Sequence, residues 1–374
     1  MNFLKTEREI LEKYIPKLNE KLASILFYEM ETNGNPAIQI FRDLNGPGLL
    51  IPTEYGGKGV TPLEAIRVQR AIGSQAPSLA IATTMHHFTL ATIIEMLKYE
   101  GEYELLKQIA SQNLYVASGF AEGKTGASIL SPSIQAHRNS DGVVIVNGNK
   151  KPCSLSASMD LLTVSVMIPA FSGNSHELAM IVIPANSSGI ERHSFWVTPI
   201  LGGAESDSVV LNNVQIPEEC ISYLGEPGNL DSVQAKGFIW FELLISASYL
   251  GIVSALVEKV LCASKGIASE RNLLVLEIEG AMSSLEGVAY SLMQSHEKNE
   301  DDVARAFFVR HSVQRSIERC SFHAVELLGG IEFISNPEIG YLMSAARALA
   351  FHPPSRLSIS SALDKYLLGE SLKI

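Results

Sequence analysis

The stretch GFIWFELLISASYLGIVSALVEKVLCAS, from Gly237 to Ser264, carries the strongest structural signal in this chain, because it is almost wholly apolar at helical spacing. Two more segments of more than 20 residues follow it with apolar residues three and four positions apart. They are LLVLEIEGAMSSLEGVAYSLMQS (273–295) and DDVARAFFVRHSVQRSIERCSFHAVELLGG (301–330). Helices this long and this apolar pack side by side. The sequence therefore predicts a helical bundle in the C-terminal part of the chain.

Two other patterns precede this bundle. Up to about Gln112 the spacing is again helical, in EREILEKYIPKLNEKLASILFYEM (7–30) and TPLEAIRVQRAIGSQAPSLAIATTMHHFTLATIIEML (61–97). From about Leu114 to Pro217 it shortens to Val- and Ile-rich strands bounded by Gly, Asn or Pro. The predicted strands are GVVIVNGNK (142–150), DLLTVSVMIP (160–169), LAMIVIP (178–184) and SDSVVLNNVQIP (206–217). The segments NSDG (139–142) and VNGNK (146–150) are hairpin-turn signals.

The order of these patterns predicts three domains. We expect an N-terminal α-helical domain over 1–113, a central β-domain over 114–228 and a C-terminal helical bundle over 229–374. This order argues against a doubly wound parallel sheet, in which strands and helices alternate.

Composition restricts the kinds of partner. The chain has 374 residues, 46% hydrophobic and 18% charged, with a net charge of −11, which is typical of a globular protein. The acidic balance argues against nucleic acid or an anionic membrane as the main partner. Four cysteines lie far apart without metal-ligand spacing, as expected of reduced thiols in a cytoplasmic protein. The first residues do not resemble a signal or transit peptide, and we expect no membrane span.

Four segments, in order, resemble the acyl-CoA dehydrogenase family. They are GPGLLIPTEYGGKGVTPLEAIRVQRAIGSQAPSLA (46–80), GFAEGKTGASILSPSIQAHRNSDGVVIVNGNKKPCSLSASMDLLTVSV (119–166), LGGAESDSVVLNNVQIPEECISYLGEPG (201–228) and AVELLGGIEFISNPEIGYLMSAARAL (324–349). The resemblance implies a multidomain α+β fold with N-terminal helices, a central antiparallel β-barrel-like domain and a C-terminal four-helix bundle. It also implies FAD, a homo-oligomer (a dimer or tetramer) and an acyl thioester substrate carried by coenzyme A or a carrier protein.

The resemblance further implies a flavin site. Ser154 aligns with a hydroxyl residue beside the flavin N5, while the Trp that commonly packs on the flavin is Pro152 here. An isolated serine after a strand would otherwise be a turn residue. Upstream, Ser118 and backbone N–H groups are candidates for a flavin edge or substrate. The glycines of that loop permit close approach of the backbone to a ligand, namely Gly119, Gly123 and Gly126.

Other positions depart from the family pattern. The segment SKGIASERNLLV (264–275) lacks the family's Arg-x-x-Phe-Gly motif. Lys265 or Arg271 could hold a phosphate there, although a solvated charge at a helix end is the commoner role of such residues. Glu326 replaces a usual Gln, and a carboxylate repels a pyrophosphate. Gly329 and Gly330 are retained as predicted cofactor contacts, although they also suit an ordinary helix end.

The usual catalytic base is missing. Most of the family carries Glu in a Tyr-Glu-Gly-Thr motif, whereas this chain has FHPPS (351–355), which aligns Pro353 with the Glu and Ser355 with the Thr. Proline also removes the backbone N–H that would polarise a thioester carbonyl. A slip of one residue would place His352 at the site, with a side chain able to act as a base near neutral pH.

A second candidate base lies in the long apolar helix. Some family members keep the Glu there, and alignment places Phe241 at that position with Glu242 next to it. A buried carboxylate is costly unless it is paired or functional. Pairing with a charged neighbour is the alternative role for Glu242. His86 and His87, on a helix that lines the acyl pocket in the family, suit core positions.

Three functions remain open. The first is an FAD-dependent dehydrogenase of acyl thioesters with an atypical base, which passes electrons to an acceptor flavoprotein. The second is a flavin-dependent monooxygenase of the same fold, in which reduced flavin from a partner reductase reacts with oxygen and no α-proton is removed. The third is a non-catalytic relative.

Overall fold

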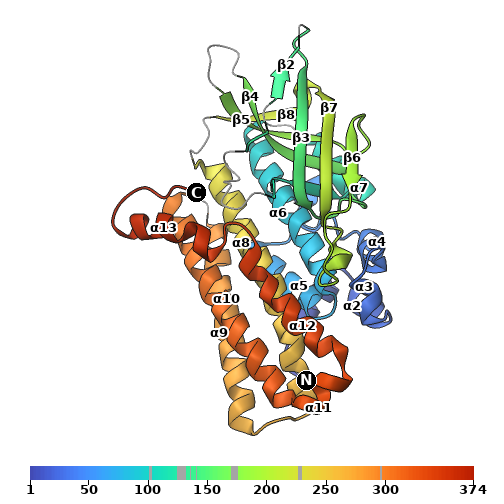
Figure 1. Ribbon diagram of the computed structural model, residues 1–374, viewed down its shortest axis with the longest axis vertical. Coiled ribbons are helices and arrows are strands. Elements are labelled where there is room, and N and C mark those ends of the chain that lie inside the picture. The colour runs from blue at the N-terminus through green and yellow to red at the C-terminus, as the bar shows by residue number, and fades with distance from the viewer. Residues whose placement is uncertain are drawn as a thin grey trace.

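The computed structural model describes residues 1–100, 103–123, 132–134, 136–139, 141–169, 176–225, 230–294 and 297–374. The strands gather at one end of an elongated molecule, and the long C-terminal helices extend to the other end (Figure 1). The predicted succession of helices, strands and helices is therefore confirmed. The predicted loop residue Gly126 lies outside the described residues.

The N-terminal helices are shorter than the periodicity alone suggested. The predicted helix over 7–30 is divided near Pro16, and the one over 61–97 is divided before Pro77, since proline lacks the N–H that a helix interior needs. Thr61 caps one of the resulting helices by accepting a hydrogen bond from the Glu64 N–H. The helices are α1 (Lys5–Tyr14), α2 (Leu18–Ala23), α3 (Phe27–Met30), α4 (Pro36–Asp43), α5 (Pro62–Gly73), α6 (Pro77–Glu100) and α7 (Glu104–Gln112).

Two four-stranded sheets form the β-domain. One has the order β1 (Val116–Gly119), β4 (Leu161–Pro169), β5 (His176–Pro184) and β8 (Ile221–Gly225). The other has the order β2 (Ala136–Arg138), β3 (Val144–Cys153), β7 (Asp207–Ile216) and β6 (Ile190–His193). All the pairs are antiparallel except β1 with β4, which run parallel. The sequence predicted the four longest strands and missed the short ones.

The two hairpin-turn predictions had different outcomes. The first segment, NSDG (139–142), lies in the connection between β2 and β3. There the Asn139 side chain accepts hydrogen bonds from the N–H groups of Asp141 and Val143. The second, VNGNK (146–150), is wrong because this segment continues β3. The register against β7 shifts between Val146 and Gly148, so the Asn-Gly pair forms an irregularity within the strand and not a turn.

The C-terminal helices pack around α8. They are α8 (Ser232–Cys262), α9 (Ala268–Met293), α10 (Glu300–Leu328), α11 (Gly330–Ser335), α12 (Pro337–Arg347) and α13 (Arg356–Leu367), with a short turn of 3-10 helix, η4 (Ala348–Phe351), before α13. Helices α9, α10 and α12 all contact α8, and α5 and α6 pack on it as well. This central position explains why the sequence of α8 is apolar on every side.

Helix α8 also corrects one expectation. Ser232–Cys262 is long and apolar enough to cross a membrane, which the sequence analysis did not anticipate. Its most apolar 18-residue window is 100% buried inside the protein, as expected for the core helix of a bundle.

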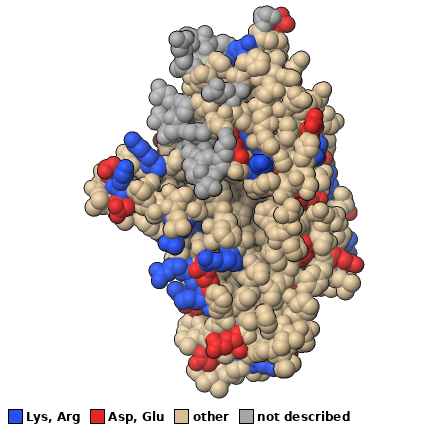
Figure 2. Space-filling view, in the orientation of Figure 1, with Lys and Arg blue, Asp and Glu red and all other residues tan. Residues whose placement is uncertain are grey.

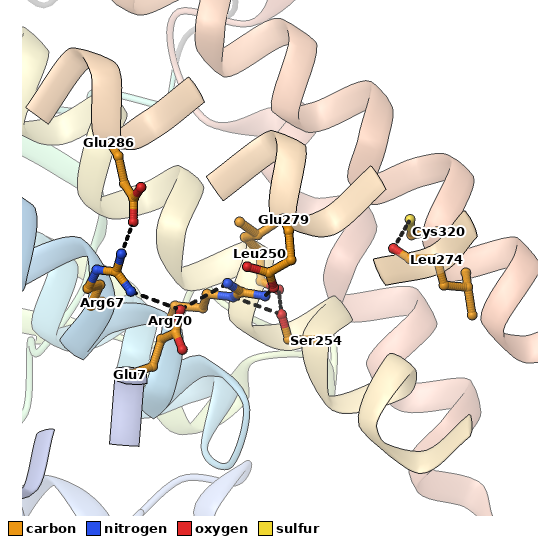
Figure 3. Close-up of polar contacts among 9 residues, drawn as sticks. All are labelled: Glu7, Arg67, Arg70, Leu250, Ser254, Leu274, Glu279, Glu286 and Cys320. Carbon is orange, nitrogen blue, oxygen red and sulfur yellow. Dashed lines mark hydrogen bonds and ion pairs between the residues drawn. The ribbon is translucent and has the colours of Figure 1, made fainter. Parts of the chain in front are cut away.

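A buried ionic cluster joins the N-terminal helix to this core (Figure 3). The Arg70 side chain, on α5, is fully buried, and its Nη1 lies 3.0 Å from Glu7 Oε1 on α1. Its Nη2 lies 2.6 Å from Glu279 Oε1 on α9, and its Nε donates to the Ser254 hydroxyl on α8. Arg67 also lies 3.7 Å from Glu7. One guanidinium thus connects four helices.

The crossing of α5 and α8 depends on two glycines. A Cβ at Gly251 would overlap the carbonyl oxygen of Arg70 and crowd Gly73. We expect Gly251→Ala to lower the free energy of unfolding by about 1–3 kcal/mol, because the helices must separate to admit the methyl group. Gly280, on α9, has no atom within 4 Å of such a Cβ, so Gly280→Ala is the matched control. Urea unfolding measures the free energy of unfolding of both variants. An equal loss in Gly251→Ala and Gly280→Ala would contradict the prediction.

The surface shows no single dominant charge on the face drawn in Figure 2. Lys and Arg side chains alternate there with Asp and Glu, and broad uncharged areas lie between them.

Candidate flavin and substrate pocket

A cavity lies where α6, α8 and the turn after η4 meet the β-domain. Its described lining contains no Asp, Glu, Lys or Arg. Most lining side chains are apolar, with a few hydroxyl and amide groups among them, which is typical of a small-molecule site. The lining is Ile81, Met85, Phe88, Thr92, Ser118, Phe120, Ala121, Pro152, Ser154, Ser165, Leu178, Met180, Trp196, Leu201, Ser206, Leu224, Gln234, Gly237, Phe238, Phe241, Tyr249, His352 and Pro353.

Helical periodicity explains how α6 and α8 reach this cavity. Positions three or four apart share one face of a helix, and the α6 side chains in the lining follow that spacing: Ile81, Met85, Phe88 and Thr92. On α8, a Cβ at Gly237 would lie 2.8 Å from the Thr92 hydroxyl oxygen, so the two helices are close together at this point. A side chain at Gly237 would require the Thr92 side chain to move.

Aromatic rings form one wall of the cavity. Ring centres lie 5.9 Å apart for Phe120 and Phe88, 5.1 Å for Phe88 and Phe241, and 6.2 Å for Phe241 and His352. These distances are those of ordinary packed aromatic pairs. The wall runs from the β-domain to the turn after η4 and leaves room only for ligands that tolerate an apolar surface.

Polar groups of the lining suit the edge of a flavin ring. The hydroxyl oxygens of Ser154 and Ser206 lie 2.9 Å apart, and Ser118 contributes a third hydroxyl. The Gln234 side-chain nitrogen is buried without a hydrogen-bond partner among the described residues, so it has a free donor beside the cavity. Carbonyl and ring-nitrogen acceptors of a flavin would satisfy such donors. The residues present therefore fit a flavin.

Trp196 is a lining residue that the sequence analysis missed. Its indole N–H donates to the carbonyl oxygen of Ile200 at 2.8 Å, and its backbone N–H donates to the Asp207 carboxylate at 3.2 Å. It lines the same cavity as Pro152, the position at which the family's flavin-packing Trp is absent. The chain has only two Trp residues, and this rarity was the one feature of the sequence that could have pointed to Trp196 as a candidate site residue.

His352, the candidate base from a one-residue slip of the alignment, lies in the lining beside Pro353. Its Nε2 and the Tyr249 hydroxyl oxygen are 2.8 Å apart. Burial, and to a lesser degree the nearby Arg310 cation, together lower the pKa of His352 to about 3. The imidazole is therefore neutral at ordinary pH. It can exchange a hydrogen bond with a ligand but carries no charge.

Glu242 does not line the cavity. Successive helical residues point about 100° apart, so Phe241 faces the cavity while Glu242 faces α10. There Glu242 Oε2 lies 3.1 Å from Arg310 Nε, with both side chains 1% exposed. Burial raises the pKa of Glu242 to about 7, and Arg310 opposes this rise. This placement matches the alternative in which Glu242 pairs with a charged neighbour, not the role of base.

The remaining predicted cofactor residues lie elsewhere. Gly119, in β1, is next to the lining residue Ser118, and a Cβ there would lie 2.7 Å from the Thr163 carbonyl oxygen. Gly329 ends α10 with a positive φ of 89°, and Gly330 begins α11. Ser355 caps α13 by accepting a hydrogen bond from the Ser358 N–H. None of these four is in the described lining, so their predicted contacts with a cofactor stay predictions.

Two further expectations concern Arg271 as a phosphate ligand and His86 as a core residue. Arg271 Nη1 donates to the carbonyl oxygens of Ser264, Lys265 and Gly266, so this side chain stabilises the turn after α8. A phosphate contact of Lys265 or Arg271 stays a prediction. His86 is a core residue, as expected: its Nε2 lies 2.9 Å from the Pro47 carbonyl oxygen, and its Nδ1 accepts from the Val116 N–H.

The neighbouring core histidine, His87, differs from His86 in its hydrogen bonding. His87 is buried, yet neither ring nitrogen has a hydrogen-bond partner among the described residues. Burial holds its pKa well below the usual range, so the ring is neutral. It packs against Phe41, with ring centres 5.9 Å apart, and does not line the cavity.

Comparison with known proteins shows what the chain as a whole resembles. No family model matches the chain. The chain is 42% identical over 381 residues to isobutylamine N-hydroxylase from Streptomyces viridifaciens, and the match covers 100% of both chains. It is 23% identical over 355 residues to glutaryl-CoA dehydrogenase from Desulfococcus multivorans, covering 87% of each.

A solved structure supports the fold. The chain is similar to FMN-bound TdsC from Paenibacillus sp. A11-2, with a TM-score of 0.79 and 17% identity over 99% of this chain and 98% of that one. The fold predicted from the resemblance is thus confirmed, and so is the expectation of a flavin enzyme. The chain belongs to the acyl-CoA dehydrogenase family of flavin-dependent oxidoreductases, as an atypical member that lacks the C-terminal glutamate.

Proposed function

We propose that this protein is a flavin-dependent monooxygenase that hydroxylates the nitrogen of a small alkyl amine. The observation that carries the proposal is the described lining of the cavity, which holds a neutral histidine and no carboxylate. The similarity to isobutylamine N-hydroxylase supports the amine as substrate. This proposal replaces dehydrogenation of an acyl thioester, the leading expectation from the sequence, because that reaction needs a base to remove the α-proton. The described lining has no carboxylate, and its one imidazole, His352, has a pKa of about 3.

Reduced flavin, when bound, supplies the chemistry that splits molecular oxygen. The overall reaction converts the amine, O2 and reduced flavin to the hydroxylamine, water and oxidised flavin. One oxygen atom forms the new N–O bond, and the two electrons of the flavin reduce the other to water.

The residues of this chain would bind and orient the amine. The aromatic wall of Phe88, Phe120 and Phe241 would hold the alkyl group and exclude water. An amine nitrogen attacks only with its lone pair free, and the uncharged lining favours the free base over the ammonium ion. His352 would exchange a hydrogen bond with the amine while remaining uncharged.

The direct test of the function supplies reduced flavin and oxygen. Purified protein is mixed with a flavin reductase, NADH, FMN and isobutylamine, and the hydroxylamine is measured by mass spectrometry. We expect 18O from labelled oxygen in the product. Anaerobic bleaching of bound flavin by an acyl thioester, with no hydroxylamine formed from any small primary amine, would instead support the dehydrogenase.

We propose FMN in place of FAD as the flavin. The support is the similarity to an FMN-bound structure and the lack, in 264–275, of the Arg-x-x-Phe-Gly motif that meets the FAD pyrophosphate in the family. In a Trp240→Phe variant, Trp196 is the sole Trp, and we expect FMN to quench its fluorescence strongly because the indole lines the cavity. FMN should bind at least as tightly as FAD. A tenfold preference for FAD in this titration would contradict the proposal.

The rate should rise with pH. An alkyl ammonium has a pKa of about 10, so its free-base fraction grows about tenfold per pH unit between pH 6 and 9. Because burial lowers the pKa of His352 to about 3, that group does not titrate in this range. We expect kcat/KM for the amine to follow the free base, measured with photochemically reduced FMN. A fluorinated alkyl amine of lower pKa should shift the profile to lower pH, and identical flat profiles would contradict the prediction.

The partners remain proposals. A separate reductase that delivers reduced flavin fits this function, and a homo-oligomer fits the exposed apolar side chains of α9 and α11, among them Leu273, Leu276, Ile331 and Ile334.

A further inference from the structure

One buried guanidinium holds the turn that carries His352. Arg310 Nη2 donates to the carbonyl oxygens of His352 at 2.7 Å and Leu349 at 3.1 Å. Its Nη1 donates to the carbonyl oxygen of Pro354 at 2.6 Å. Three carbonyls of one short segment thus converge on a side chain that is 1% exposed. A guanidinium suits this task because its donors have a fixed planar geometry.

The turn depends on this cation because of its composition. Pro353 and Pro354 have no N–H groups, so neither can donate a backbone hydrogen bond within the turn. Buried carbonyls left without donors would cost free energy. Outside η4, the His352 N–H donates to the Leu349 carbonyl oxygen at 3.3 Å. Arg310 supplies the donors that the prolines lack.

Glu242 compensates the charge of Arg310. A buried cation is stable only when it is paired, and Glu242 Oε1 accepts from Arg310 Nη1 at 3.4 Å. The Nε–H does not point at Oε2 despite their separation of 3.1 Å, so that contact is ionic and not a hydrogen bond. Glu242 and Phe241 are neighbours on α8, so the pair also fixes the turn relative to the aromatic wall.

We infer that Arg310 and Glu242 are positioning residues that hold the His352 imidazole against Tyr249 at the cavity wall. Neither is in the described lining of the cavity, and they act through His352. The expected effect on hydroxylamine formation rests on the proposed function, whereas the expected effect on the position of the His352 ring does not. The carboxylate that resembles a displaced catalytic base is, on this inference, the counterion of the cation that orders the turn.

The test removes both charges together. The double variant Arg310→Met with Glu242→Met leaves no unpaired buried charge, so it is expected to fold. A matched control is the pair Glu7→Met with Arg70→Met, a buried Glu–Arg pair in the α1–α5 contact. We expect the first double variant to lower hydroxylamine formed per reduced flavin consumed by about tenfold, with hydrogen peroxide formed in its place. The control should change this ratio less than twofold.

A double-mutant cycle identifies the route of the effect. In a His352→Ala background, the change at Arg310 and Glu242 should cause almost no further loss, because its action passes through the removed ring. An equal tenfold loss in both backgrounds would overturn the inference. If the double variant does not fold, Arg310→Lys is the substitute, since an ammonium keeps the charge but lacks the planar fork that reaches three carbonyls.

Histidine NMR separates this inference from the proposed function. In protein labelled with 15N-histidine, the His352 ring signals are assigned by their loss in His352→Gln. They should shift or broaden in the Arg310/Glu242 variant and stay in place in the Glu7/Arg70 control. If they shift but no amine is hydroxylated by the wild type, the positioning role stands and the proposed function fails. Unchanged signals would overturn the positioning role whatever the activity.

Discussion

Replacing His352 by alanine is expected to lower the rate of hydroxylamine formation about 100-fold, the lower end of what the loss of one positioned hydrogen-bonding group costs in an active site. The ring lines the cavity, contacts Phe241 and exchanges a hydrogen bond with Tyr249 at 2.8 Å. It is also the one imidazole in the described lining. Reduced flavin should still be consumed, so hydrogen peroxide should replace most of the product.

The measurement is product and peroxide per reduced FMN consumed, together with FMN affinity. Tyr249→Phe is the matched variant, because it removes only the hydroxyl that meets His352 Nε2. We expect a smaller loss from this change, about tenfold, since the ring stays in place but loses one partner. Full activity of His352→Ala would exclude the imidazole from the chemistry. Loss of FMN binding in that variant would instead assign the ring to the cofactor.

The sequence predicted the fold well because its signals are local. Helical period in the stretch around Gly237–Ser264 and β-branched runs such as 160–169 each depend on one segment. Its errors were of two kinds. Prolines divided helices that periodicity joined, and Asn147-Gly148 formed an irregularity in β3 where a turn was predicted. In the second case the neighbouring strand β7 overrode the preference of the dipeptide.

The site was harder to predict because it joins distant segments. The sequence identified Ser118, Ser154 and His352 as candidates, and the structure places all three in one lining. It could not decide the role of Glu242, because the partner of that carboxylate is Arg310, 68 residues away on another helix. Consecutive residues of α8 point about 100° apart, so Phe241 lines the cavity while the next residue, Glu242, faces away from it. Trp196 was missed because its loop has no periodic pattern.

Replacing Arg70 by methionine is expected to lower the free energy of unfolding by about 3–5 kcal/mol, the typical cost of breaking a buried ion pair. Methionine fills much of the space but leaves Glu7 buried beside a single, more distant cation, Arg67 at 3.7 Å. Glu279 should matter less, because its side chain is 47% exposed and water can solvate it. The Ser254 hydroxyl would also lose its bond from Arg70 Nε.

Urea unfolding followed by circular dichroism measures this loss, and the double variant with Glu7→Met distinguishes its cause. If the cost comes from an unpaired buried carboxylate, removing that carboxylate as well should recover most of the stability, because an apolar pair is often as stable as the ion pair it replaces. If the single and double variants are equally unstable, packing or the Ser254 contact must dominate. The ion pair would then serve to fix how α1 docks on α5, and limited proteolysis near the N-terminus should detect its release in both variants.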